Sequence, residues 1–274
     1  MRQGLLIRAV LNSLSKGMIL MDLTSRVNAA QRAARCAGEM LRTHGTLRVT
    51  EKANNDFVTD LDLKSEAIIR EILLSAFPED EFYSEESGGS QNVQGRWIVD
   101  PIDGTQSFLR AQHGWCVSIA YECAGEMVIG CVYAPDTDEM FLGVRGQGAT
   151  LNGKPIHVSD IADPRRALLH FGYGHRVEAS FQRFMSHIRD LFSKISDVRR
   201  YGTAAYAICT IACGRSDAFA ELGLCIYDIA AAKVILEEAG GIMTGWKGEA
   251  DAVITGNVIA SNGLLHTFFL DELG

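Results

Sequence analysis

The chain has 274 residues, of which 47% are hydrophobic and 22% charged, a composition typical of an ordinary soluble globular protein with a substantial core. Its formal net charge of −8 argues against general nucleic-acid binding, which favours a basic face. No apolar run approaches the length of a membrane helix, so we expect neither nucleic acid nor membrane among the partners.

The first 23 residues are predicted to form an N-terminal extension whose role the sequence leaves open. The first 21 contain Arg2, Arg8 and Lys16 and no acid, which faintly resembles a targeting peptide, but they lack a convincing small-residue cleavage site. Met21-Asp22 has the form of a natural start. The extension is therefore either the product of an upstream start codon or an extra helix.

Two helices are predicted next. Thr24 or Ser25 can cap an alanine-rich helix that runs to about Leu41, with Gly45 beyond its end. A second helix is expected from Asp62 to Phe77, where Pro78 stops it. Its apolar face should comprise Leu63, Ala67, Ile68, Ile72 and Phe77. Strands are expected around Phe82-Tyr83 and Trp97–Val99.

The pattern then changes twice. From Trp115 to Val158, short apolar runs are separated by turn signals, which predicts an antiparallel meander. The signals are Ala124-Gly125, Pro135-Asp136, Gly146-Gln147-Gly148 and Asn152-Gly153. After Pro164, strands and helices alternate. The expected strands are Ala167–Phe171, Val198–Tyr201 and Ala218–Ala220, and the expected helices are Glu178–Phe192, Thr203–Cys213 and Asp228–Ala239.

An antiparallel lobe followed by an α/β lobe predicts an α/β protein built from layers of sheets and helices. We expect one lobe over residues 24–160 and a second over residues 161–274. The weakest connection lies near Ser159 to Arg166.

The segment Asp100-Pro101-Ile102-Asp103-Gly104-Thr105 follows the apolar run Trp97-Ile98-Val99. Pro101 should turn the chain between the two carboxylates. A short helix starting at Gly104-Thr105 would offer free N–H groups to an anion. Acidic oxygens beside a phosphate-sized anion site indicate magnesium-assisted phosphate chemistry, whereas the alternative is a pair of ordinary turns.

Three further segments accompany this motif: Asp56–Asp62, Tyr83–Ser87 and Tyr227-Asp228 with the helix that follows to Gly240-Gly241. Together and in this order, the four segments resemble the inositol monophosphatase family of magnesium-dependent, lithium-sensitive phosphatases, over roughly residues 25–265. The resemblance implies the layered sandwich of that sugar phosphatase fold, with the active site between an antiparallel N-terminal lobe that binds the metals and an α/β C-terminal lobe that completes the site.

The resemblance also implies Mg²⁺ ligands. One ion falls to Glu85, Asp100 and the backbone carbonyl of Ile102, and a second to Asp100, Asp103 and Asp228. A third, weaker site near Glu85 is described for the family. On physical grounds, four carboxylates that converge without cations would be strongly disfavoured.

For catalysis, the resemblance implies a water molecule oriented by Glu85 and by the Thr105 hydroxyl, with Asp62 supporting Thr105. The Gly104 and Thr105 N–H groups would hold phosphate oxygens. Two plainer interpretations stay open: Asp228 as a helix N-terminal acid and Asp62 as a simple N-cap.

The alcohol half of the substrate is implied to contact Asp103, Thr203, Ala204 and Glu221. Gln106-Ser107-Phe108, Arg110–His113 and Tyr227 depart from the inositol-type pattern, which weakens inositol itself as the substrate. We therefore predict a small polyol or sugar phosphate. The alternatives are histidinol phosphate, a 3′(2′),5′-bisphosphate nucleotide, and a non-enzymatic regulatory binding protein, because one bacterial relative is tied to RNA-processing machinery. Retention of Asp62, Thr59, Glu85 and Thr105 argues against that last alternative.

Seven cysteines form no Cys-x-x-Cys pair and lie mostly in apolar stretches, which predicts buried free thiols and a reducing cytoplasm. The resemblance also implies a homodimer.

Overall fold

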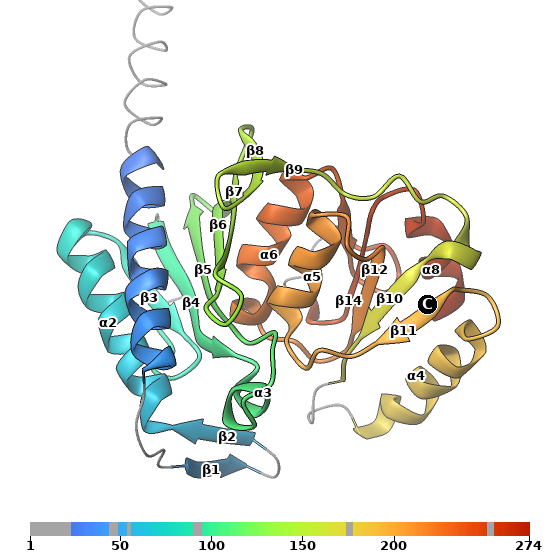
Figure 1. The fold of residues 1–274 in the computed structure, drawn as a ribbon, viewed down its shortest axis with the longest axis horizontal. Helices are drawn as coiled ribbons and strands as arrows, with labels where there is room; N and C mark the ends of the chain where they lie inside the picture. The colour runs from blue at the N-terminus through green and yellow to red at the C-terminus, as the bar shows by residue number, and fades with distance from the viewer. Residues whose placement is uncertain (1–22, 44–48, 54–55, 90–94, 174–177, 251–254) are drawn as a thin grey trace, which may run out of the picture.

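The computed structural model describes residues 23–43, 49–53, 56–89, 95–173, 178–250 and 255–274. Within them, a seven-stranded and a five-stranded sheet alternate with three pairs of helices, giving five layers, and a two-stranded hairpin lies at one end (Figure 1). This is the layered α/β arrangement that the sequence predicts.

The seven-stranded sheet has its strands in chain order. They are β3 (Glu81–Ser84), β4 (Gly95–Asp103), β5 (Cys116–Cys123), β6 (Glu126–Ala134), β7 (Glu139–Val144), β8 (Gly148–Leu151) and β9 (Lys154–Ile156). Only the β3–β4 pair is parallel, and the neighbours from β4 to β9 pair antiparallel. The predicted meander is therefore confirmed, with each predicted turn signal at or beside the end of a strand.

The five-stranded sheet has the order β11-β10-β12-β14-β13. Its strands are β10 (Leu168–Phe171), β11 (Asp197–Arg199), β12 (Ala218–Glu221), β13 (Ile242–Thr244) and β14 (Val258–Ser261). β10 pairs parallel with β11 and β12, whereas β14 pairs antiparallel with β12 and β13. The predicted strands of the second half are confirmed, whereas β13 and β14 were not predicted.

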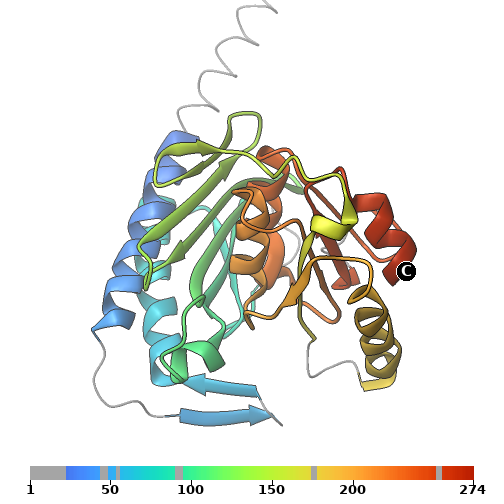
Figure 2. The same cartoon turned by 45° about the vertical axis from the view of Figure 1, so that its right-hand side comes forward.

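The helices fill the remaining layers. Residues 23–42 and α2 (Asp60–Ala76) cover the outer face of the larger sheet, α5 (Ala204–Ala212) and α6 (Ile226–Glu238) lie between the sheets, and α4 (Glu178–Leu191) and α8 (His266–Leu273) cover the outer face of the smaller one (Figures 1 and 2). Three apolar cores correspond to these three helix layers. The shorter elements are β1 (Val49–Ala53), β2 (Asp56–Thr59), α3 (Thr105–Leu109) and the 3-10 helix Pro164–Arg166.

The α6 helix packs directly on the backbone of the larger sheet. Gly130 of β6 and Gly143 of β7 are cross-strand partners. A Cβ atom on Gly130 would lie 2.9 Å from the carbonyl carbon of Ala231 and closer still to its oxygen, and one on Gly143 would lie 2.7 Å from Cα of Ile235. This pair of glycines therefore leaves the space that α6 occupies.

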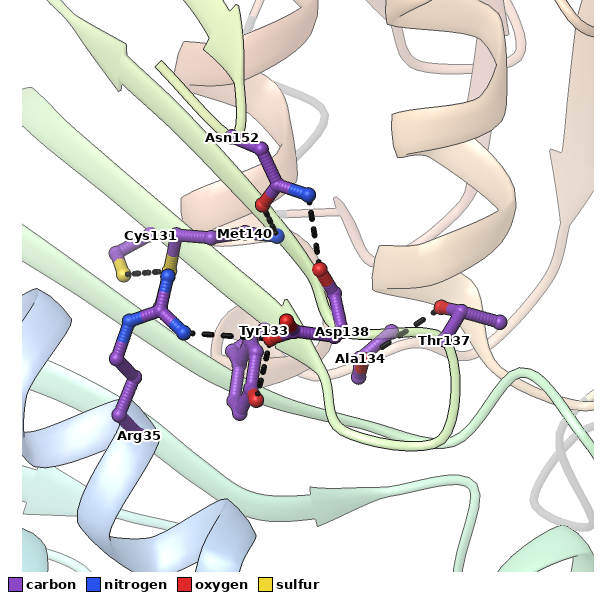
Figure 3. Close-up of polar contacts among 8 residues, drawn as sticks. All are labelled: Arg35, Cys131, Tyr133, Ala134, Thr137, Asp138, Met140 and Asn152. Atoms are coloured by element: carbon purple, nitrogen blue, oxygen red, sulfur yellow. Dashed lines mark hydrogen bonds and ion pairs between the residues drawn. The ribbon is translucent and has the colours of Figure 1, made fainter.

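A polar cluster at the β6–β7 turn attaches the first helix to the sheet (Figure 3). The Asp138 carboxylate accepts hydrogen bonds from the Tyr133 hydroxyl at 2.9 Å and from Arg35 at 3.3 Å. The Asn152 amide donates to the Asp138 carbonyl at 2.9 Å and accepts from the Met140 N–H at 2.8 Å. Asn152 of the predicted Asn-Gly turn between β8 and β9 thus also holds the turn between β6 and β7 in place.

One prediction about the N-terminal helices is wrong and another is right in part. Leu23 is already helical, so neither Thr24 nor Ser25 caps the first helix; Gly45 and residues 1–22 of the predicted extension lie outside the described residues. Of the predicted apolar face of α2, Ile68, Ile72 and Phe77 are partly buried and pack against the core, whereas Leu63 and Ala67 are exposed. The fully buried apolar positions of this helix are Leu61, Ile69 and Leu73.

The phase of α2 differs because polar residues share its buried face. The Ser65 hydroxyl donates to the Pro101 carbonyl at 3.0 Å, and the Glu66 carboxylate accepts from the Ser84 hydroxyl. A buried polar group that has a hydrogen-bond partner is tolerated, so the face that turns inward is not the most apolar one.

The predicted boundary between lobes at residues 160 and 161 stays a prediction, because the core between the sheets draws on both sides of it. All seven cysteines are free, but only Cys116, Cys131 and Cys209 are buried, so the prediction of mostly buried thiols is wrong. Among the helices in the described ranges, none is long and apolar enough to cross a membrane.

Candidate active site

Strand β4 carries both aspartates of the Asp100–Thr105 motif. The predicted turn at Pro101 is wrong, because β4 continues through Asp103. The ladder to β5 shifts between Asp100 and Asp103, where β4 accommodates one residue more than its partner. The Pro101 carbonyl instead accepts the hydrogen bond from Ser65 of α2. Both carboxylates are buried, with Asp100 2% and Asp103 7% exposed.

The Asp103 carboxylate is held from two sides. Its Oδ2 accepts a hydrogen bond from the Ala205 N–H at 2.8 Å and one from the Cys116 thiol at 3.8 Å. The pKa of Asp103 is raised to about 7, mainly by burial and in part by the charge of Glu85, against the opposing effect of the Ala205 and Ala204 N–H groups. The N-terminus of α5 therefore fixes the position of this carboxylate, although burial makes its ionisation unfavourable.

The Asp100 carboxylate lies at the centre of an acidic cluster. Its Oδ1 accepts a hydrogen bond from the Ile102 N–H at 3.0 Å. The pKa of Asp100 is raised well above its ordinary value, first by burial and then by the charges of Glu85, Asp103, Asp228 and Asp62. The structure thus brings together the acidic side chains that the sequence selected from four separate segments.

Besides Asp100 and Asp103 of β4 itself, these acids come from three elements near its end (Figures 1 and 2). Asp62 lies in the first turn of α2 and Asp228 in the first turn of α6. Glu85 follows β3, and its N–H donates to the Val99 carbonyl of β4 at 3.2 Å. The parallel pairing of β3 with β4 is what places Glu85 beside the aspartates.

Asp228 has a local role as well. Its Oδ2 accepts a hydrogen bond from the Cys225 N–H at 2.6 Å and so caps α6. The interpretation of Asp228 as a helix N-terminal acid is therefore correct, and the same residue adds its charge to the cluster around Asp100.

The Gly104–Thr105 step joins β4 to α3. Gly104 has φ 88°, and a Cβ atom there would collide with the Thr203 methyl and lie 3.3 Å from the Thr203 Cβ. The Thr105 hydroxyl donates to the Ile102 carbonyl at 3.2 Å. The Thr203 hydroxyl oxygen is buried and, within the described part of the chain, has no hydrogen-bond partner. Thr203 therefore lies against Gly104, and the Ala204 N–H acts on Asp103, whereas their contact with the alcohol stays a prediction.

An aromatic stack holds the loop before Thr203. The Tyr201 ring stacks on the buried His170 ring of β10, with centroids 4.6 Å apart, and meets the Tyr206 ring edge-on at 5.3 Å. The Ser107 hydroxyl of α3 donates to the Tyr201 carbonyl at 3.2 Å. These contacts attach the loop to both β10 and α3, so the N-terminus of α5 faces Asp103.

Glu221 ends β12 and extends the acidic region. Its pKa is raised to about 8, mainly by burial and in part by the charges of Asp228 and Asp103, against the opposing effect of the Arg200 guanidinium. Glu221 is therefore a neighbour of Asp228 and Asp103, and its contact with the alcohol stays a prediction.

The sequence did not reveal several contributors. Cys116 and the Ala205 N–H bind Asp103, Arg200 acts on Glu221, and Gly172 lies against the Glu221 carboxylate. A glycine at the end of a strand is a signal of close backbone approach and could have drawn attention to Gly172. Nothing in the sequence distinguishes the other three.

The donor set fits Mg²⁺ in its chemistry. The predicted ligands are all oxygen atoms, which this hard cation prefers, and the cluster carries more negative charge than its surroundings compensate. Among the described side chains, no three of His, Cys, Asp or Glu already meet in the close geometry of a formed metal site. The assignment of individual ligands therefore stays a prediction.

Comparisons with known proteins agree with the fold. The model of the inositol monophosphatase family matches residues 22–273. Nus factor SuhB from Vibrio cholerae is 38% identical over 242 residues, which cover 86% of this chain and 91% of that protein.

Two solved structures are similar throughout. Extragenic suppressor protein suhB from Bartonella henselae has a TM-score of 0.86 at 35% identity, covering 90% of this chain and 97% of that one. Inositol monophosphatase from Anabaena has a TM-score of 0.81 at 32% identity, covering 92% and 96%. With a family match over nearly its whole length, the chain belongs to the inositol monophosphatase family.

Proposed function

We propose that the protein is a magnesium-dependent phosphomonoesterase that hydrolyses a small polyol or sugar phosphate. The observation that carries this proposal is the gathering of Glu85, Asp103, Asp228 and Asp62 around the buried Asp100. Such a cluster is costly without cations, and family membership supports a phosphatase.

The residues would hold two ions, with a third, weaker one near Glu85. The first would bind Glu85, Asp100 and the Ile102 carbonyl, and the second Asp100, Asp103 and Asp228. Bound Mg²⁺ would neutralise the carboxylates and lower the pKa of a water molecule at neutral pH.

The side chains around this site have distinct tasks. Glu85 and the Thr105 hydroxyl orient the attacking water, and Asp62 supports that arrangement by its negative charge. The Gly104 and Thr105 N–H groups bind phosphate oxygens. The Thr105 hydroxyl lies 3.2 Å from the Ile102 carbonyl, which supports its placement beside a predicted ligand.

The alcohol half binds beyond Asp103. Its proposed contacts are Asp103, Thr203, Ala204 and Glu221. In support, the Thr203 methyl lies against Gly104, and the charges of Asp228 and Asp103 act on Glu221. A polyhydroxylated substrate would supply partners for the Glu221 carboxylate, whereas an apolar alcohol would leave it unsatisfied.

A phosphate-release panel tests the proposal. Purified protein is assayed with inositol, sugar, histidinol and nucleotide phosphates, with Mg²⁺ or with excess chelator. We expect Mg²⁺-dependent release that is fastest on a polyol or sugar phosphate. Full release in chelator contradicts the mechanism, and preference for histidinol or nucleotide phosphate transfers the assignment to that alternative.

A second candidate function is a regulatory binding role, which the name of the relative Nus factor SuhB favours. The expectation from net charge that nucleic acid is not among the partners therefore stays a prediction. An Asp103→Asn variant without phosphatase activity separates the two roles. If this variant restores normal growth to a strain that lacks the protein, binding is the cellular role. If it does not restore growth, hydrolysis is the cellular role.

We further propose a reducing, cytoplasmic setting, which the seven free cysteines support. A homodimer stays an expectation from the family.

A further inference from the structure

Gly172 directly follows β10 and lies beside the last residue of β12. Its N–H donates to the Ala220 carbonyl at 3.0 Å, continuing the ladder that pairs Phe171 with Ala220. The next residue of β12 is Glu221, the acid that we propose as a contact for the substrate hydroxyl groups. Backbone pairing therefore sets the position of Gly172 relative to Glu221.

The Glu221 carboxylate occupies the space that a side chain at position 172 would need. A Cβ atom on Gly172 would lie 2.7 Å from Oε1 of Glu221 and closer still to its Cδ and Oε2. Gly172 does not have a left-handed φ, so its backbone conformation is open to other residues. Steric room for the carboxylate is thus the reason for glycine here.

The same carboxylate has unused acceptors. Among the hydrogen bonds and ion pairs of the described residues, none involves the Glu221 side chain, and Arg200 acts on it only through its charge. A carboxyl group accepts hydrogen bonds in either protonation state and, when protonated, also donates one. A partly buried carboxyl group in this state is suited to form hydrogen bonds with the hydroxyl groups of a ligand.

We propose that Gly172 is a specificity-determining residue: by carrying no side chain, it lets the Glu221 carboxylate lie where it selects hydroxyl-bearing alcohols. This inference rests on the proposed function. Gly172 acts through Glu221 and is a positioning residue, because the atom that meets the substrate is the carboxylate oxygen.

Gly172→Ala tests the proposal with two substrates, a polyol phosphate and an aryl phosphate without hydroxyl groups. Because the carboxylate must move, we expect kcat/KM on the polyol phosphate to fall about 10–100-fold, mainly through KM. Activity on the aryl phosphate should stay within about twofold, because the metal and phosphate contacts are unchanged.

A double-mutant cycle shows whether Gly172 acts through Glu221. If it does, Gly172→Ala combined with Glu221→Gln loses no more polyol activity than Glu221→Gln alone. Additive losses overturn the proposal. If Gly172→Ala does not fold, the combination with Glu221→Asp decides, because a shorter side chain retracts the carboxylate. Recovery of a folded protein supports the shared space, and failure to recover overturns it.

Gly245→Ala is a matched control. Gly245 also lacks a left-handed φ, and a Cβ atom there would lie 2.5 Å from Oε2 of Glu249, an exposed carboxylate outside the site. We expect its kinetics to match those of the parent protein on both substrates.

The outcomes separate this inference from the proposed function. Absence of Mg²⁺-dependent release by the parent protein on both substrates contradicts the function itself. Suppose that the parent protein prefers the polyol phosphate and that Glu221→Gln removes this preference. If Gly172→Ala then keeps the preference, only the role of Gly172 is overturned. Equal losses on both substrates in Gly172→Ala also overturn it, since Gly172 then serves the fold or the metal site.

Discussion

Replacing Asp103 by Asn should stabilise the metal-free protein while removing most activity. The Ala205 N–H can still donate to the side-chain oxygen of the introduced asparagine, so the geometry at this position is retained. The negative charge that burial and Glu85 disfavour is lost. A variant that is more stable yet inactive is the signature of a carboxylate kept for a cation.

The size of the effect follows from the pKa. A rise from 3.8 to about 7 corresponds to about 4 kcal/mol of unfavourable ionisation above pH 7. With relaxation of the surroundings we expect about 2–4 kcal/mol, which for a chain of this length is an increase in Tm of about 4–8 °C. At pH 4 the effect should almost vanish, because Asp103 is then protonated in the folded protein.

Thermal unfolding in chelator at pH 4 and pH 8 measures the stability of the metal-free protein, and phosphate release in Mg²⁺ measures the activity. We expect activity at least about 100-fold below that of the parent. Asp271→Asn, an exposed position on α8, should change neither quantity. A lower Tm for Asp103→Asn at pH 8, or retained activity, refutes the reasoning, because Asp103 would then be a structural acceptor.

The metal-free protein should lose stability as pH rises from about 4 through 8, because the raised pKa values of Asp103 and Glu221 mean that the folded state binds more protons than the unfolded state. Saturating Mg²⁺ should therefore increase Tm more at pH 8 than at pH 5.5; equal increases contradict this. Lithium should inhibit uncompetitively with respect to substrate if it enters the second ion site after hydrolysis, whereas simple competition contradicts that order. Gly104→Ala should reduce activity on every ester more than about tenfold through strain and collision with Thr203, whereas Gly153→Ala, with φ 76° and open space, should lose about 1–2 kcal/mol of stability and no activity.

Local signals predicted the parts of the fold that local physics determines. The turn at Asn152-Gly153 and the other hairpins of the meander lie where turn chemistry places them, because both neighbouring strands are close in sequence. The buried face of α2 was predicted only in part, because the partners of Ser65 and Glu66 lie in β4 and β3, which a helical periodicity does not contain.

The site shows the same division. The sequence selected Asp100 and Asp103, but the turn predicted between them does not form, because a bulge opposite β5 accommodates Pro101 within the strand. Cys116 reaches Asp103 only through that β4–β5 register, and Gly172 reaches Glu221 only through the pairing of β10 with β12. Contacts between strands far apart in sequence leave no short motif.

The glycine pair under α6 has a consequence for how this site can vary. Asp228 is carried by α6 and the aspartates of β4 by the sheet, so the separation between the two halves of the site depends on how closely the helix approaches the sheet. At Gly130 and Gly143 that approach is backbone against backbone, and such a contact is nearly incompressible. A single methyl group there would lift the helix and its carboxylate away from Asp100. Apolar positions remote from any substrate thus set the distance across the site, and a search confined to polar residues would overlook them.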